Sequence, residues 1–250
     1  MSIRCHPALV SLLLVCALTA PAAARVSPFV RLDFGGGDLR MTDVDKSITA
    51  NQTELQAAGY PARFQKAGSA YGPSAAAGVW LTPAVRVGAT YSYQKARHSN
   101  QLLSTDPAIY YVQNLDMRMS EVGVEAAVRF DRLQGLILGV NVAQGRAEAS
   151  EDRSTEGLIT EHLDGSMLDV SMTAKRTKPT YGAFIGIDQT NVDGVAGYIR
   201  AGFQYRDMGH MPGSSSTFNG VTTTPGTGDT VWMDFSGFYL KVGVGFDRVR

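Results

Sequence analysis

The sequence predicts an all-β protein: an eight-stranded antiparallel up-and-down transmembrane β-barrel with four long extracellular loops and three short periplasmic turns. Three features indicate this fold. Apolar residues occupy every second position in several stretches, short and long connections alternate along the chain, and the two faces of each strand differ in chemistry.

The N-terminal segment has the pattern of a secretory signal peptide. Arg4 supplies a positive charge, an apolar run follows from Ala8 to Ala20, and a series of small residues ends at Ala24. The apolar run is shorter than the roughly 18–20 residues that a membrane-spanning helix needs. We therefore predict a signal peptide at residues 1–24, cleaved after Ala24, and an exported barrel domain at residues 25–250.

Export and composition exclude several classes of protein. Both cysteines, Cys5 and Cys16, lie in the predicted signal peptide, so no disulfide stabilises the mature chain and the small disulfide-rich secreted folds are excluded. The signal also removes Arg4 from a chain in which 23 Lys and Arg residues balance 23 Asp and Glu residues, which leaves a formal charge of −1. No nucleic-acid partner is expected for such a chain.

Paired alternating stretches predict three tight hairpins. In the first of them, Val85, Val87 and Ala89 alternate with Arg86 and Gly88. The paired stretches are residues 74–81 with 85–94, 122–130 with 136–142, and 181–187 with 199–205. Two further stretches, VSPFVRLDF near the start and FYLKVGVGF near the end, complete the eight strands.

The connections between these strands differ in length in a regular way. Short connections at about 82–84, 131–134 and 189–195 alternate with long polar connections at about 38–72, 96–113, 149–177 and 207–230. This alternation places all tight turns at one end of the barrel and all long loops at the other, as in bacterial outer-membrane barrels. A soluble β-sandwich has no reason to sort its loops in this way.

The non-apolar strand face carries charges of both signs, which predicts a polar lumen. In a membrane barrel the opposite face meets lipid over about 9–11 residues, often with an aromatic residue at an end, such as Tyr91 or Phe246. The alternative is a soluble barrel whose apolar face forms an internal ligand-binding calyx. The predicted luminal charge network consists of Arg31, Asp33, Arg86, Glu125, Arg129, Asp188, Arg200 and Lys241.

The apolar parity changes upstream of Glu121. Leu115, Met117 and Met119 occupy the opposite parity from Val122 and the apolar residues after it. We interpret this change as a β-bulge or as a strand that leaves the membrane zone.

The architecture of nearly the whole mature chain resembles small eight-stranded outer-membrane barrels, the OmpA-like transmembrane domain with its OmpX-like and OmpW-like relatives. Closing strands of such barrels typically read polar-x-Gly-x-x-aromatic-x-aromatic. Lys241, Gly243 and Phe246 stand in the first three of these places, whereas Arg248 replaces the final aromatic residue. The resemblance implies that this strand is the assembly signal that the barrel-assembly machinery recognises.

The same resemblance implies a location and partners. We expect the protein in the bacterial outer membrane, exported through the general secretory pathway, with outer-membrane lipid and lipopolysaccharide as partners. An eight-stranded barrel has an interior just wide enough for side chains to fill, so paired luminal charges predict a plugged or very narrow lumen. The protein would then act as a surface-loop scaffold for binding, adhesion or envelope integrity, with the surface ligand unidentified.

The resemblance also suggests two alternative functions. An OmpW-like channel for small hydrophobic solutes is the alternative, with inward aromatic residues at Trp80, Phe184, Tyr198 and Phe235. Catalysis is not expected, and no catalytic, cofactor-binding or metal site is predicted. The sequence His98-Ser99-Asn100 is similar to the His-x-Ser-Asn element of lipid A deacylases, but Ser99 on a strand would point away from His98.

The remaining candidate residues carry weaker signals. His162 has no evident partner, and His210 lies in a Gly-rich loop where it is expected to be solvated. The stretch DVDKSITANQTE has the oxygen-ligand spacing of an EF-hand calcium loop, but Ile48 stands where that loop requires glycine. A solvated loop is therefore expected there.

Overall fold

The computed structural model describes residues 26–38, 42–66, 68–103, 109–157, 170–190, 194–218, 221–223 and 230–247. The predicted signal peptide lies outside the described residues. The elements are β1 (Ser27–Asp38), α2 (Thr42–Ala57), β2 (Ser69–Trp80), β3 (Val85–Leu103), β4 (Ile109–Phe130), the 3-10 helix η1 (Asp131–Leu133), β5 (Leu136–Gly157), β6 (Val170–Thr190), β7 (Val195–Tyr205), β8 (Asp207–Phe218), β9 (Val221–Thr223), β10 (Thr230–Asp234) and β11 (Gly237–Asp247).

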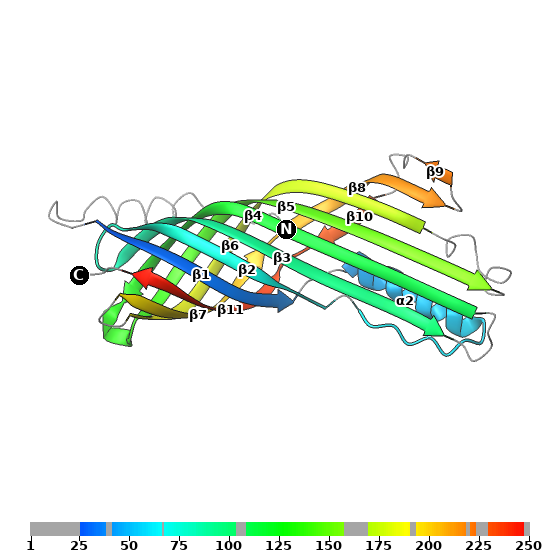
Figure 1. Ribbon diagram of the computed structural model, residues 1–250, viewed down its shortest axis with the longest axis horizontal. Coiled ribbons are helices and arrows are strands. Elements are labelled where there is room, and N and C mark those ends of the chain that lie inside the picture. The colour runs from blue at the N-terminus through cyan, green and yellow to red at the C-terminus, as the bar shows by residue number, and fades with distance from the viewer. Residues whose placement is uncertain are drawn as a thin grey trace, which may run out of the picture.

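Eight of these strands close into a ring (Figure 1). Strands β1 to β6 each pair with the next strand along the chain, and β11 pairs with both β7 and β1. Every pairing is antiparallel. Because β11 pairs with β1, the ring is closed and has no free edge at which another strand could add. The predicted fold class, an eight-stranded antiparallel up-and-down barrel, is confirmed.

The connections between β2 and β3, β4 and β5, and β6 and β7 lie at one end of the ring, the turn end. In the first, the Val85 backbone N–H donates to the Thr82 hydroxyl at 3.0 Å. In the second, η1 is followed by Gln134 and Gly135, whose φ angles are 55° and 78°. A Cβ at Gly135 would collide with a backbone carbonyl of β6, so both backbone conformation and space favour glycine at the end of this turn.

The outward face of the ring is apolar and exposed. The outward side chains of β11, from Phe238 to Phe246, are 47–69% exposed, and Leu32 on β1 and Val124 on β4 are 61% and 62% exposed. A continuous apolar belt of this kind is unfavourable in water, by about 25 cal/mol for each Å². Because the charged side chains point inward, the barrel has the polarity of a membrane barrel and not that of a soluble calyx.

Four strands continue well beyond the ring. β3, β4, β5 and β6 contain 19, 22, 22 and 21 residues, whereas β1, β2, β7 and β11 contain 11 or 12. Figure 1 shows the long strands projecting past the others at the end opposite the turn end. We call this projecting part the wall; it comprises residues 95–103, 109–120, 145–157 and 170–179.

The prediction of four long polar loops is wrong, because much of their expected length forms the wall. Much of the expected loops at 96–113 and 149–177 is strand, and the expected loop at 207–230 contains β8 and β9. β8 pairs with the start of β6, and β10 pairs with β8, which widens the wall. In the parts of the wall whose burial is described, at 95–103, 145–152 and 173–179, the inward residues are more buried than the outward ones, as in the rest of the barrel. Their polar side faces outward, so their composition resembles that of loops.

The change of parity in β4 has a simple cause. Leu115, Met117 and Met119 point to the inner side of the wall and are buried. β4 keeps one unbroken register with β3 and with β5, so the interpretation as a bulge is wrong and the strand does leave the membrane zone. Inside the wall these residues form an apolar cluster, the methionine plug, with Ile48, Ala70, Ala96, Ala147, Ala149, Ala174, Met208, Met211 and Phe235.

Helix α2 covers part of the inner side of the wall. Its Leu55 is fully buried against Tyr111 of β4, and Phe64 stacks on the Tyr111 ring with centroids 5.2 Å apart. The Asn51 amide also donates to the Tyr111 hydroxyl at 3.2 Å. Among the described residues, no helix has the length and apolarity needed to cross a bilayer.

The stretch with EF-hand-like spacing is therefore not a solvated loop. It lies in α2, where Ile48 joins the methionine plug and Leu55 is buried. A helix distributes the acidic and polar side chains around its axis, whereas a calcium loop directs them to one point. Within the described ranges, no three His, Cys, Asp or Glu side chains are grouped to hold a metal ion.

Lipid contact at the apolar belt can be tested by stability. Replacing Val124 with Arg should lower the free energy of unfolding in phospholipid vesicles by about 2–4 kcal/mol, because the charge would lie near the middle of the bilayer. Denaturant unfolding followed by tryptophan fluorescence measures the change. Val124→Leu is the control and should shift stability by less than about 0.5 kcal/mol. Equal stability of the two variants would contradict lipid contact.

Candidate functional site

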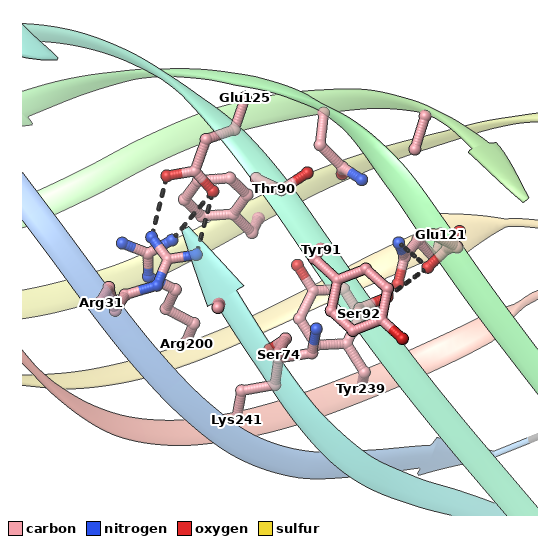
Figure 2. A pocket seen from close by; sticks show the side chains of 15 residues that line it. Arg31, Ser74, Thr90, Tyr91, Ser92, Glu121, Glu125, Arg200, Tyr239 and Lys241 are labelled. Atoms are coloured by element: carbon pink, nitrogen blue, oxygen red, sulfur yellow. Dashed lines mark hydrogen bonds and ion pairs between the residues drawn. The ribbon is translucent and has the colours of Figure 1, made fainter. Parts of the chain in front are cut away.

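The centre of the lumen is a network of ion pairs built from inward positions of the ring strands. Arg31 of β1 binds Glu125 of β4 with two parallel hydrogen bonds of 2.8 and 3.0 Å. Arg200 of β7 donates to the same carboxylate at 3.4 Å, as Figure 2 shows. A bidentate Arg–carboxylate pair is among the strongest polar contacts in proteins, so Glu125 links three strands across the lumen.

A second carboxylate lies beside this pair. Asp188 of β6 accepts a hydrogen bond of 2.6 Å from Arg86 of β3 and lies 3.7 Å from the Arg200 guanidinium. Arg86 is also 3.7 Å from Glu125, and both Arg86 and Asp188 are almost completely buried. Asp33, next to Arg31 on the inward face of β1, accepts from the Arg31 guanidinium. Six of the eight predicted luminal residues are therefore in one connected cluster, which we call the Glu125 cluster.

Two predicted members of the network are not joined to the Glu125 cluster by an ion pair among the described residues. Arg129 pairs with Asp131 of η1 at 2.8 Å, because it stands at the end of β4 where the turn begins. Its guanidinium carbon also lies 5.8 Å from the centre of the Trp80 ring, so Arg129 faces the lumen but is not joined to the Glu125 cluster. Lys241 does face the lumen, but among the described residues it forms no ion pair within 4.0 Å; its ammonium group lies 5.2 Å from the centre of the Tyr239 ring.

A second cluster, centred on Glu121, was not predicted. Arg206 binds both Glu121 oxygens and donates to Gln94 at 2.6 Å. Glu121 also accepts from Ser92, Thr180 and Gln204 at 2.8, 2.7 and 3.1 Å. Strand parity could have placed Glu121 in the lumen, because Glu121 is four residues before Glu125 and is therefore on the same strand face.

Arg206 is positioned by the junction between the ring and the wall. It stands between β7 and β8, and its backbone N–H donates to the Ser236 hydroxyl at 2.7 Å. Its carbonyl accepts from the Phe235 N–H at 3.2 Å. The Glu121 cluster thus joins β4 to the segments that enter β8 and β11.

A small cavity of about 40 Å³ separates the two clusters. Glu121 and Glu125 both line it, and Lys241 and Tyr239 face it from β11 (Figure 2). This volume and polar lining suit a few water molecules, which need about 10–15 Å³ each on the same measure. The cavity is too small for a solute of drug size, which takes about 300–1,000 Å³.

Apolar layers lie on both sides of the charged layers. Toward the turn end, Trp80 and Phe184 belong to a buried cluster with Phe29, Ala76, Ala127 and Ile137. Toward the wall, the methionine plug contains Met119 and Phe235. Three of the four inward aromatic residues expected to line a hydrophobic channel, Trp80, Phe184 and Phe235, are therefore packed against other side chains. The fourth, Tyr198, has its ring centre 5.9 and 5.5 Å from the guanidinium carbons of Arg31 and Arg200.

Glycines provide the room that the large luminal side chains need. A Cβ at Gly243 would collide with the Asp33 carboxylate, and a Cβ at Gly139 would overlap the ring of Phe184. Gly243 and Lys241 of the predicted assembly signal therefore face the lumen, whereas Phe246 points outward to the belt. Recognition of this strand by the assembly machinery stays a prediction.

The deacylase-like sequence does not form a catalytic pair. His98 is on the inner side of the wall and Ser99 on the outer side, where the Ser99 hydroxyl donates to the Asn114 side chain at 2.8 Å. The Asn100 side chain is hydrogen bonded to the backbone of Gln65 at 3.0 and 3.3 Å. His162 and the side chain of His210 lie outside the described residues.

Known proteins resemble this chain only in structure. No protein-family model matches it, and no curated protein matches it by sequence. The attachment invasion locus protein Ail of Yersinia pestis is 10% identical, with 88% of this chain and 97% of that chain covered and a TM-score of 0.45. Neisserial surface protein A is 14% identical, with 89% and 99% covered and a TM-score of 0.43. OprG of Pseudomonas aeruginosa is 9% identical, with 89% and 96% covered and a TM-score of 0.43.

These identities describe a likeness of fold, and the roles of those proteins do not carry over. The cellular location of the protein follows from its own structure. A closed antiparallel ring with an exposed apolar belt, a charged lumen and short turns at one end is the construction of bacterial outer-membrane barrels. The chain is an integral outer-membrane protein, as the sequence predicts.

Removing the charge of the central carboxylate, Glu125, should destabilise the folded barrel. Glu125→Gln should lower the free energy of unfolding in detergent micelles by about 3–5 kcal/mol, because Arg31 and Arg200 would stay buried without their shared partner. Glu148→Gln is the matched control. Glu148 pairs with Lys175 at 3.0 Å on the exposed outer side of the wall, so its loss should cost less than about 1 kcal/mol. A Glu125 variant as mild as the control would contradict the importance of the cluster.

Proposed function

We propose that this protein is a surface scaffold: a closed outer-membrane barrel that anchors an ordered extracellular cap used for binding, adhesion or envelope integrity. The cap consists of the wall, α2 and the β8 to β10 segment. The single observation that carries the proposal is that charged and apolar side chains fill the lumen in successive layers.

A closed lumen leaves no path for polar solutes. A solute would have to separate Arg206 from Glu121 and then Arg31 and Arg200 from Glu125. Each separation exposes a buried charge without its partner, which costs several kcal/mol. The work of such a barrel therefore falls to the part that stands outside the membrane.

The cap has the properties of a rigid binding platform. It has its own apolar core, the methionine plug, and a second cluster of Leu55, Ala62, Leu102 and Tyr111. Its strands are continuous with those of the ring, so the membrane anchor fixes their positions. Surfaces on such elements hold their geometry better than surfaces on loops.

A channel for hydrophobic solutes has less support. It requires an open apolar path, whereas Trp80, Phe184 and Phe235 are buried in packed clusters. The cavity between the two charge clusters is polar and small. Uptake of an apolar fluorescent dye into cells that depends on this protein would favour the channel over the scaffold.

Display of the cap outside the cell can be tested by cysteine labelling, because the mature chain is expected to have no cysteine. Ser99→Cys places a thiol on the outer side of the wall, and it should react with a membrane-impermeant maleimide in intact cells. Arg132→Cys, at the exposed turn end, is the control and should react only after the outer membrane is permeabilised. The reverse pattern would contradict the orientation, and protection of both sites in intact cells would place the cap inside the cell envelope.

A further inference from the structure

The charged layers of the lumen contain one cation that no carboxylate neutralises. The Glu125 cluster has three arginines and three carboxylates, and the Glu121 cluster has one of each. Lys241 lies between these two balanced clusters, and among the described residues it forms no ion pair within 4.0 Å. The two clusters and Lys241 together therefore carry one positive charge in excess.

The strand register places Lys241 directly opposite another cation. On β11 it pairs with Arg200 of β7 on one side and with Gly35 of β1 on the other. Both cationic side chains face the lumen, and like charges at opposite positions of a strand pair destabilise a sheet. Gly35 has no side chain that could supply a countercharge. A negative group beside Lys241 and Arg200 would remove this repulsion.

The carboxylates of the lumen are bound to other cations or lie too far away. Asp33, diagonally opposite Lys241 on β1, accepts from Arg31, and Glu121 is bound through both oxygens within its own cluster. Asp247 is the other buried carboxylate on the inner side of the ring, but it is six residues from Lys241, or about 20 Å along β11. The missing negative charge must therefore come from outside the described chain.

The small cavity between the two clusters offers hydrogen-bond donors to a negative group. Lys241 and Ser74 face this space in Figure 2, and Arg200 lines it as well. The Ser74 hydroxyl is buried and has no hydrogen-bond partner in the part of the chain that the structure describes, and the same holds for Nε and Nη2 of Arg200. Buried donors are seldom left without a partner in folded proteins. Strands β2, β7 and β11 thus direct donors toward one space.

The size and charge of the cavity limit the kind of ligand. Its volume of about 40 Å³ accepts a few particles of the size of water and is too small for an organic anion. One excess positive charge requires one negative charge. An ammonium group, a hydroxyl and guanidinium N–H groups can all donate to one spherical anion. Chloride, which is monovalent and only slightly larger than water, satisfies these conditions.

We propose that the cavity between the Glu121 and Glu125 clusters is a binding site for chloride, held by Lys241, Ser74 and Arg200. The anion neutralises the excess charge and lies between like charges that would otherwise repel each other. It is enclosed when the ring closes during folding, because the two clusters obstruct the lumen on either side of the cavity. The bound ion completes the charge balance of a closed lumen and is not conducted through it.

Unfolding at different chloride concentrations tests the site. The whole mature protein is unfolded and refolded with urea in zwitterionic detergent micelles, while sodium chloride replaces sodium gluconate at constant ionic strength. Gluconate is too large for the cavity, whereas chloride can enter before the ring closes. The midpoint of urea unfolding should rise by about 0.5 M or more up to about 150 mM chloride, because chloride binds only the folded barrel. A midpoint that does not change with chloride would overturn the site.

Substitutions separate the site from general effects of salt. Lys241→Met removes the excess charge and keeps a long side chain, so its unfolding midpoint should not depend on chloride. Lys66→Met removes an exposed cation outside the lumen and should respond to chloride as wild type does. Lys241→Gln serves the same purpose if Lys241→Met does not fold. A chloride response that persists in the Lys241 variant, or disappears in the control, would contradict the site.

Crystals grown in sodium bromide would locate the anion directly, because bromide replaces chloride and scatters anomalously. We expect an anomalous peak in the cavity, within hydrogen-bond distance of Lys241 Nζ and the Ser74 hydroxyl, and no peak there in Lys241→Met. Bromide found only at the protein surface would indicate an adventitious ion only and would overturn the site. The labelling test of surface display does not depend on either result.

Discussion

The structure depends on the pairing of charges across a narrow lumen. A membrane barrel must present apolar side chains to lipid, and strand alternation then sends the remaining side chains inward. With only eight strands the interior has no room for bulk water, so buried inward charges need partners, most of which come from other strands. Glu125 of β4 meets this requirement by binding Arg31 and Arg200. These two arginines come from β1 and β7, which are distant from β4 in the sequence. One ring register satisfies all three residues, so the network that closes the lumen also specifies how the ring closes.

The long strands combine two environments in one continuous ladder. In β4, the inward side chains change from Glu121 and Glu125 within the ring to Met117 and Met119 within the wall. The outward side chains change in the opposite sense, from Val122 to Arg118. The solvent outside changes from lipid to water at this level, and the inside changes from an ion-pair network to an apolar core. The wall is half a barrel, and α2 with the β8 to β10 segment supplies the cover that its apolar inner side requires.

The sequence determines the ring well and the cap poorly, for physical reasons that particular residues illustrate. Alternation with period two is local, so the outward residues of β11 and the inward charges of the ring could be assigned without a structure. The Arg206 to Glu121 contact joins residues 85 positions apart and could not be assigned, although parity placed Glu121 inside. Arg129 faces the lumen as parity predicts, but parity gives the face of a strand and not the height along it, so the pairing of Arg129 with Asp131 near the turn could not be assigned.

The sequence does not predict the wall and α2, because their residue patterns are those of loops. Strands with water on one side carry polar outward residues, and α2 has only a few apolar residues, such as Ile48 and Leu55. Burial of those residues depends on strands that lie far away in the chain, so tertiary packing and not local propensity makes this segment helical.

Conductance across a planar lipid bilayer tests closure of the lumen most directly. The folded full-length protein should give no steady current above that of a protein-free bilayer, because the Glu125 cluster, the Glu121 cluster and the methionine plug all obstruct the path. Steady currents comparable to those of a general porin would contradict a closed lumen and with it the role of the barrel as an anchor.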